Sequence, residues 1–215
     1  MKLSSFFTLV LSLLLTVFTV QKGIAQSPAT KPLTIIIEAA HGGQDNGAQI
    51  DNVKEKDINL KYAIALEQEA KKNNIKVIMA RQDDTQFPLT ERPNLAGKSN
   101  ADVYIILHTN TNPKNSLANG MEIYTGINHQ PLQNKVLGKF VGAEMYNAKL
   151  FTLRGVNINP MNSLDLTRTP TVMIELAYLS NEKDKTLLLD KNSPDIIAQH
   201  LVKALLQYQQ YSFEN

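Results

Sequence analysis

Short apolar runs alternate with longer stretches in which apolar residues recur at helical spacing. The runs are five or six residues long, are rich in β-branched side chains, and predict buried strands at 33–37, 75–80, 103–107, 121–125 and 171–176. The intervening amphipathic stretches predict helices at 57–73, 131–150 and 196–211, and a loop at 81–97 leads into a short helix. We expect the polar segment 152–168 to be irregular. The alternation predicts a single α/β domain with a mostly parallel twisted sheet flanked by helices on both faces.

The first 25 residues have the pattern of a signal peptide. A lysine precedes the apolar stretch 6–20, which is short for a membrane span, and Gly23-Ile24-Ala25 supplies small residues for cleavage after Ala25. The alternative is an uncleaved membrane anchor. We therefore expect a signal peptide at 1–25, a flexible leader at 26–32 and a folded domain at 33–215. Such a protein would be exported, periplasmic or extracellular, with no stable membrane anchor after cleavage.

Composition narrows the chemistry that this domain can perform. The chain has no cysteine, so disulfides and thiolate metal sites are excluded, and a protein-built metal site must use His, Asp or Glu. The formal net charge is +2, and loss of 1–25 removes two lysines and no acid, which leaves a neutral protein. This balance gives no reason to expect a nucleic-acid partner. We expect a monomer.

Two of the four histidines directly follow predicted strands. His41 comes after the first strand in His-Gly-Gly, and His108 comes after the third. Carboxyl ends of parallel strands share one edge of a sheet, where open α/β sheets bind ligands. Two imidazoles there need a third ligand for a catalytic metal, and Glu55 is the candidate, although an acid at a helix N-terminus is also favoured by the helix dipole. His129 lies in a polar loop and His200 on a helix, so both are weaker candidates.

A carboxylate inside an apolar run is the second chemical signal. Glu175 lies in Val172-Met-Ile-Glu-Leu176, where burial would raise its pKa toward the range of a general base, unless the side chain simply reaches solvent. Asn110, two residues beyond His108, is either a substrate-binding residue or an ordinary loop asparagine.

Four segments, in order, carry a resemblance to a known family. IIIEAAHGGQDNGA, VKEKDINL, ADVYIILHTN and TPTVMIELAYLSN are similar to the zinc-dependent N-acetylmuramoyl-L-alanine amidases of bacterial cell walls, the Amidase_3 family. The resemblance covers the chain from Leu33 to the last helix. It implies Zn²⁺ held by His41, Glu55 and His108, with Glu175 as the catalytic carboxylate. It also implies peptidoglycan as substrate, cut between N-acetylmuramic acid and L-alanine.

Three positions depart from the family pattern. Glu38 replaces an aspartate, Ala40 replaces the glycine before the first ligand, and Ile106 replaces a serine near the second. These changes affect the surroundings of the ligands rather than the ligands themselves. Two alternatives therefore stay open: another exported zinc hydrolase that cuts the stem peptide, and a degenerate peptidoglycan-binding domain without turnover.

Overall fold

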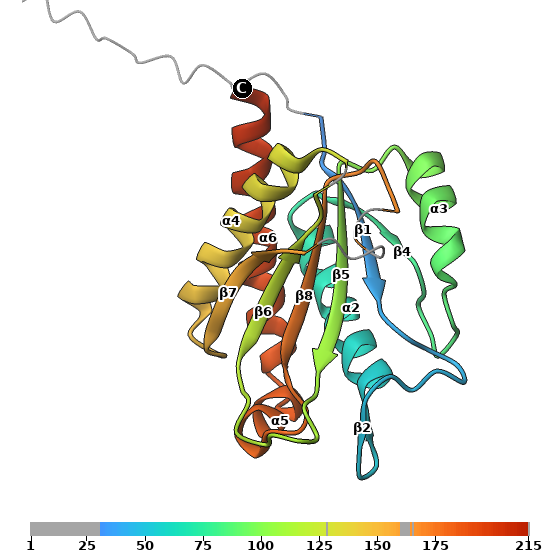
Figure 1. Ribbon diagram of the computed structural model, residues 1–215. Helices are drawn as coiled ribbons and strands as arrows, with labels where there is room; N and C mark the ends of the chain where they lie inside the picture. The colour runs from blue at the N-terminus through green and yellow to red at the C-terminus, as the bar shows by residue number, and fades with distance from the viewer. Residues whose placement is uncertain (1–30, 128, 160–163, 165, 215) are drawn as a thin grey trace, which may run out of the picture. The chain divides into compact units, whose positions relative to one another are not determined.

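A six-stranded sheet forms the centre of the protein in this computed structural model, which describes residues 31–127, 129–159, 164 and 166–214. The strand order is β4-β1-β5-β8-β6-β7, with β6 antiparallel to β8 and every other neighbouring pair parallel (Figure 1). The strands are β1 (Thr34–Ala39), β4 (Lys76–Met79), β5 (Val103–Asn110), β6 (Met121–Thr125), β7 (Leu153–Ile158) and β8 (Thr171–Tyr178). The predicted mostly parallel α/β sheet is confirmed.

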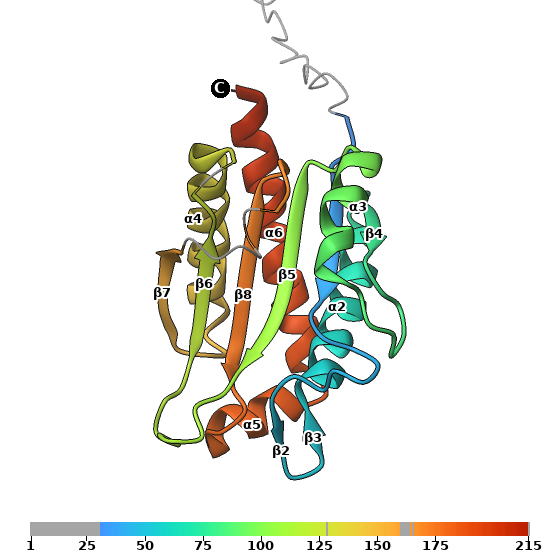
Figure 2. The ribbon, with the colours of Figure 1, turned by 45° about the vertical axis from the view of Figure 1, so that its right-hand side comes forward.

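Helices cover the two faces of the sheet unequally. One face carries α2 (Glu55–Lys72), α4 (Pro131–Ala148) and α6 (Ser193–Glu214), which enclose the larger apolar core (Figure 2). The other face carries η1 (Leu89–Glu91) and α3 (Arg92–Ser99) over a smaller apolar cluster around Ile36, Tyr104 and Ile106. Because both faces of β1 and β5 are covered, nearly all of their residues are buried, as their continuous apolar runs predict.

Several elements are longer than the periodicity predicts, and this changes where the site residues lie. Helix α2 begins at Glu55, two residues earlier than expected, after a small hairpin formed by β2 (Gln49–Ile50) and β3 (Val53–Lys54). Strand β5 continues to Asn110, so that His108 lies within the strand rather than after it, and β8 continues to Tyr178, beyond Glu175. A helix that the periodicity missed, α5 (Glu182–Leu189), starts where the Asn181 side chain accepts hydrogen bonds from two backbone N–H groups.

The prediction that 152–168 is irregular was wrong for its first part, because β7 pairs there with β6 at the edge of the sheet. Most residues of this strand face solvent, so it lacks the apolar run of a central strand. Its packing comes from α4, where Gly138 and Gly142 leave space for the Val156 side chain. A Cβ atom at Gly142 would lie 2.5 Å from Val156 Cγ2, so this contact depends on a residue far away in sequence.

Residues Pro32–Asn215 form one compact unit, which agrees with a single folded domain over this range. The predicted signal peptide and nearly all of the predicted leader lie outside the described residues. Within the described residues, no helix combines the length and the apolar character needed to cross a membrane.

Candidate metal centre and active site

The first ligand candidate, His41, lies in a tight turn just after β1. His41, Gly42 and Gly43 have φ angles of 65°, 137° and 59°, a region that glycine adopts freely and histidine rarely. Backbone hydrogen bonds between Gly42 and Asp45 close the turn, at 2.9 and 3.1 Å. The Asp45 carboxylate then lies 2.8 Å from His41 Nδ1, which orients the ring and leaves Nε2 toward the site.

The second candidate, Glu55, is the first residue of α2 and is almost fully buried. The β2–β3 hairpin returns the chain to the end of β1, and the Glu55 N–H donates to the Ala48 carbonyl at 2.8 Å. The side chain accepts from the Ala48 N–H at 2.8 Å and from the Thr109 N–H at 3.0 Å. These contacts fix the carboxylate between β1 and β5.

Glu55 Oε1 lies 3.2 Å from His41 Nε2 and 2.9 Å from His108 Nδ1. One ligand atom from each of these three residues lies within 4.8 Å of the other two. The two imidazole rings stand edge to face, with centroids 5.1 Å apart. At this spacing, the two imidazole nitrogens and the carboxylate oxygen can coordinate a divalent cation such as zinc.

The electrostatic environment between His41, Glu55 and His108 favours a bound positive charge. The hydrogen bond to Glu55 raises the pKa of His41 to about 9, against the opposing effect of burial, and Asp45 adds to the increase. Burial raises the pKa of Glu55, but hydrogen bonds to His108 and His41 outweigh it and hold this pKa far below its usual value. A carboxylate that stays ionised between two imidazoles attracts a metal cation as well as a proton, so the residues fit a bound metal.

Glu175 lies beside this group on the neighbouring strand. It is the register partner of His108 on β5 and of Glu122 on β6, so that the three residues form a row across the sheet. Burial raises the pKa of Glu175 to about 7; His108 opposes the increase, and Glu55 and Glu122 add to it. A carboxyl group with this pKa can both accept and donate a proton near neutral pH.

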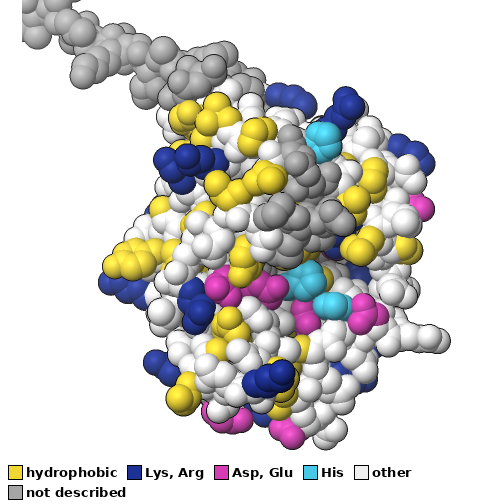
Figure 3. Space-filling model, viewed as in Figure 1, with side chains coloured by type: hydrophobic (Ala, Val, Ile, Leu, Met, Phe, Trp, Pro, Cys, Tyr) yellow, Lys and Arg dark blue, Asp and Glu magenta, His cyan; other side chains and the backbone are white. Residues whose placement is uncertain are grey.

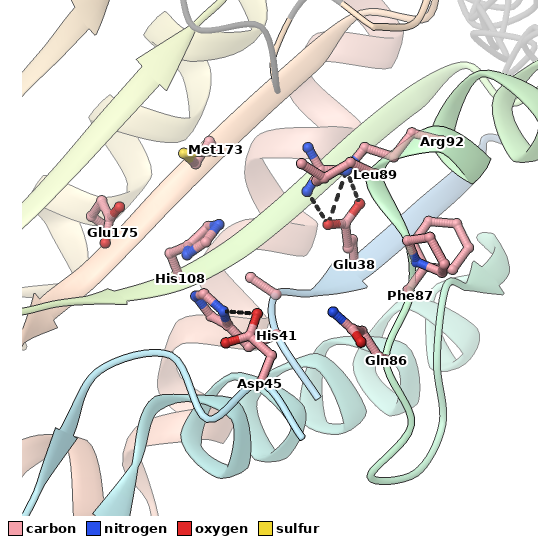
Figure 4. Close-up of a pocket in the computed structure, with 12 residues that line it drawn as sticks. Glu38, His41, Asp45, Gln86, Phe87, Leu89, Arg92, His108, Met173 and Glu175 are labelled. Atoms are coloured by element: carbon pink, nitrogen blue, oxygen red, sulfur yellow. Dashed lines mark hydrogen bonds and ion pairs between the residues drawn. The ribbon is translucent and has the colours of Figure 1, made fainter. Parts of the chain in front are cut away.

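These residues open into one cavity, of about 390 Å³. His41, His108 and Glu175 lie at one end of it, and Phe87 and Leu89 from the loop before α3 lie at the other (Figure 4). Histidine and acidic side chains gather near the middle of this face of the molecule (Figure 3). The cavity therefore has a polar end beside the ligand group and an apolar end at Phe87 and Leu89, and Leu89 itself is largely exposed.

Asn110 lies at the end of β5 and belongs to a polar network. Its Nδ2 donates to Glu122 Oε2 at 3.2 Å, and its Oδ1 accepts from the Thr111 N–H at 2.8 Å. The Tyr178 hydroxyl donates to the same Glu122 oxygen at 2.9 Å. This network adjoins Glu175 through Glu122.

The other two histidines lie away from the ligand group. His129 is exposed in the loop before α4. His200 on α6 pairs through Nδ1 with Glu144 on α4, at 3.0 Å. Neither belongs to the group formed by His41, Glu55 and His108.

The three departures from the family pattern have distinct surroundings. Glu38 is a buried residue of the cavity wall, where it pairs with Arg92 and accepts a hydrogen bond from the Tyr104 hydroxyl at 2.7 Å. Ala40 lines the cavity, and its N–H donates to the Leu107 carbonyl at 3.0 Å. Ile106 is buried in the smaller apolar cluster. None of the three belongs to the ligand group.

Sequence reasoning did not identify Asp45 as part of the site. Its signal was weak: an acid four residues after a histidine, within a glycine-rich loop. The two glycines indicated a sharp turn here, but the sequence did not show that the turn would bring Asp45 to His41.

Comparisons with known proteins identify the family of this chain. The family model described as N-acetylmuramoyl-L-alanine amidase, Amidase_3, matches residues 35–207. The probable cell wall amidase LytH of Staphylococcus saprophyticus is 33% identical over 189 residues, which cover 85% of this chain and 62% of that protein. The N-acetylmuramoyl-L-alanine amidase LytC of Bacillus subtilis is 30% identical over 176 residues, which cover 81% of this chain and 35% of that protein.

A solved structure shows the same fold. The N-acetylmuramoyl-L-alanine amidase from Clostridium difficile 630 superposes with a TM-score of 0.77 at 27% identity, covering 83% of this chain and 97% of that one. The match to the two curated relatives, by contrast, spans 62% and 35% of their length. Because the family model covers most of the chain and the fold agrees, this chain belongs to the N-acetylmuramoyl-L-alanine amidase family Amidase_3.

Proposed function

We propose that this protein hydrolyses the amide bond between N-acetylmuramic acid and L-alanine in peptidoglycan, with Zn²⁺ held by His41, Glu55 and His108. The observation that carries the proposal is the convergence of these three ligand atoms within 4.8 Å, beside Glu175, in a member of this family. The donor set of two histidines and one glutamate is one that catalytic zinc sites use.

When bound, the ion would polarise the scissile carbonyl and lower the pKa of the attacking water. The protein's own side chains and backbone groups orient the metal ligands and transfer the protons. Asp45 holds the His41 ring through Nδ1, and the Ala48 and Thr109 N–H groups hold the Glu55 carboxylate. Both sets of contacts fix ligand atoms before an ion arrives.

Glu175 is the proposed general base and acid. Its carboxylate accepts the proton from the attacking water, and the resulting carboxylic acid gives that proton to the nitrogen of the leaving L-alanine. A pKa of about 7, raised mainly by burial, suits both halves of this cycle near neutral pH. The proton balance then closes without any further group.

Asn110 is the proposed substrate-binding residue. An amide nitrogen carries two N–H groups, and the hydrogen bond to Glu122 uses one of them. Asn110 does not line the cavity, so the second N–H can donate only to a part of the substrate that extends past Glu175 toward Glu122. In this proposal the rest of the substrate lies in the cavity, from Glu175 toward Phe87 and Leu89.

We also propose export and action on the cell wall. In this proposal, residues 1–25 are a signal peptide, 26–32 a flexible leader and 33–215 the catalytic domain, which acts as a monomer outside the cytoplasm. The similarity to a relative named probable cell wall amidase supports this location.

The test is digestion of purified peptidoglycan, with the products identified by mass spectrometry. Zinc-loaded protein should release intact stem peptides that begin with L-alanine, and Glu175→Gln should abolish most of this release. Cleavage inside the stem peptide would instead support another zinc hydrolase. Binding to peptidoglycan without any release, by protein shown to contain zinc, would support a non-catalytic wall-binding domain.

A further inference from the structure

The turn that carries His41 is held from outside by the loop between β4 and η1. Three successive residues, His41, Gly42 and Gly43, have positive φ angles, and a conformation of this kind persists where its surroundings restrain it. The restraint is close, since a Cβ atom at Gly42 would lie 2.0 Å from the Thr85 carbonyl oxygen. The loop of Thr85 therefore packs directly on the turn.

Asp84, in the same loop, makes the polar contacts of this restraint. Its Oδ1 accepts from the Gly43 N–H at 2.8 Å, and its Oδ2 accepts from Lys56 Nζ at 2.7 Å. Lys56 Nζ also donates to the Gly43 carbonyl at 2.6 Å. Three hydrogen bonds thus form a closed ring of Asp84, Gly43 and Lys56, in which both the N–H and the carbonyl of Gly43 are bonded.

This ring joins two of the three segments that carry ligand candidates. Gly43 follows His41 by two residues in the turn, and Lys56 directly follows Glu55 at the start of α2. The Lys56 side chain is 6% exposed, so its position is fixed by its surroundings. A change at Asp84 would free the turn and the start of the helix to move relative to each other.

We infer that Asp84 is a positioning residue for the metal centre: through Gly43 and Lys56 it holds His41 and Glu55 at the spacing that one divalent cation needs. The inference rests on the proposed metal site and goes beyond it, because Asp84 contacts none of the three ligands in this role. Residues that orient metal ligands typically change metal affinity 10–100-fold when they are mutated, as an order of magnitude.

A purely structural role for Asp84 makes a different prediction. The Asp84 side chain is 55% exposed, but its partner Lys56 is 6% exposed, so loss of the carboxylate leaves a buried ammonium with only the Gly43 carbonyl as acceptor. The metal-free variant should therefore be less stable than the wild type. A positioning role also lowers metal affinity at a temperature at which the variant is fully folded, whereas a purely structural role does not.

The experiment compares the full chain with Asp84→Ala, Asp84→Asn and a matched control, Asp83→Asn. Asp83 is the neighbouring exposed acid, and its carboxylate contacts Thr85 rather than the turn. Chelated protein is titrated with Co²⁺, followed by the visible absorption of the bound ion, and with Zn²⁺ in competition. Thermal unfolding of each chelated protein is recorded in parallel.

We expect Asp84→Ala to bind both ions roughly 10–100-fold more weakly at a temperature well below its unfolding midpoint, where the metal-free variant is fully folded. Asp84→Asn keeps an acceptor for the Gly43 N–H but loses the charge that faces Lys56, so its affinity should be intermediate. Asp83→Asn should bind as the wild type does. At saturating Co²⁺ the Asp84→Ala spectrum should match the wild-type spectrum, because the ligand set is the same.

Three outcomes would overturn the inference. One is wild-type metal affinity in both Asp84 variants, and another is weaker binding that appears only at temperatures at which the variant is partly unfolded. The third is a wild-type protein that binds neither ion, which would also remove the proposed metal site. Metal binding by a wild type that leaves peptidoglycan uncut would refute the proposed hydrolysis alone and would still test Asp84.

Discussion

The buried ion pair between Glu38 and Arg92 predicts a large and measurable loss of stability when it is broken. Both side chains are 3% exposed, and Arg92 Nε donates to the two carboxylate oxygens at 2.8 and 3.1 Å. The Tyr104 hydroxyl donates to the same carboxylate at 2.7 Å. In Arg92→Met the carboxylate stays buried and keeps Tyr104, but loses its charged partner.

The size of the effect follows from this burial. Removing one partner of a buried pair costs about 3–5 kcal/mol, because the remaining charge is uncompensated. For a domain of this size each kcal/mol shifts the midpoint by roughly 2–4 °C, so Arg92→Met should unfold ~6–20 °C below the wild type. An exposed pair would cost ~1 kcal/mol or less.

Thermal unfolding of the chelated protein, followed by circular dichroism, measures this difference. The matched control is Lys71→Met, which breaks an exposed pair between Lys71 and Glu67 at 2.7 Å and should cost at most ~0.5 kcal/mol. The double variant of Arg92→Met with Glu38→Gln should be much less destabilised than the sum of the single variants, because no lone charge remains. A cost near that of the control, or strict additivity, would refute the reasoning.

Four further predictions concern the site and its surroundings. Glu175→Gln should lower kcat by roughly 10²–10⁴-fold while bound zinc, measured by elemental analysis, stays stoichiometric; full activity would remove Glu175 from the mechanism. Gly47→Ala should weaken metal binding in a Co²⁺ titration, since its Cβ would lie 2.6 Å from Glu55 Oε2; unchanged affinity would contradict this. Zinc at about 1,000 times its Kd should stabilise the fold by ~4 kcal/mol, and a chelator should reverse the shift in unfolding midpoint; equal midpoints with and without zinc would contradict a folded-state site. Burial raises the pKa of Glu144, but hydrogen bonds led by that from His200 outweigh it and hold the pKa below 4.5. The ionised form therefore stabilises the fold above about pH 4.5, and the advantage of the wild type over Glu144→Gln in urea unfolding should shrink as the pH falls through the folded-state pKa.

The fold class was predictable because its signal is local. The apolar runs at β1, β5 and β8 are continuous because helices or loops cover both faces of these strands. The edge strand β7 has no such run, since solvent meets most of its residues, and its pairing with β6 comes from contacts distant in sequence. Periodicity therefore found the centre of the sheet and missed its edge.

The site divides in the same way. The positions of His41 and His108 after predicted strands placed them at one edge of the sheet, and the apolar run around Glu175 marked it as a functional acid. The sequence pattern could not distinguish Glu55 from an ordinary acid at a helix N-terminus. The resemblance to the family selected it. Glu55 reaches the ligand group because the β2–β3 hairpin brings the chain back toward the end of β1, and the geometry of this hairpin cannot be read from a short stretch of sequence.

The sequence alone determined the α/β class, the absence of thiolate chemistry and the residue types available to hold a metal, because these follow from composition and short-range pattern. The tertiary structure decided that His41, Glu55 and His108 converge within 4.8 Å and that Asp45 and Asp84 support the His41 turn. It also decided that Glu38 pairs with Arg92 in the wall of the cavity. The physical reason is that a site of this kind is built from the ends of separate elements, and packing sets their spacing.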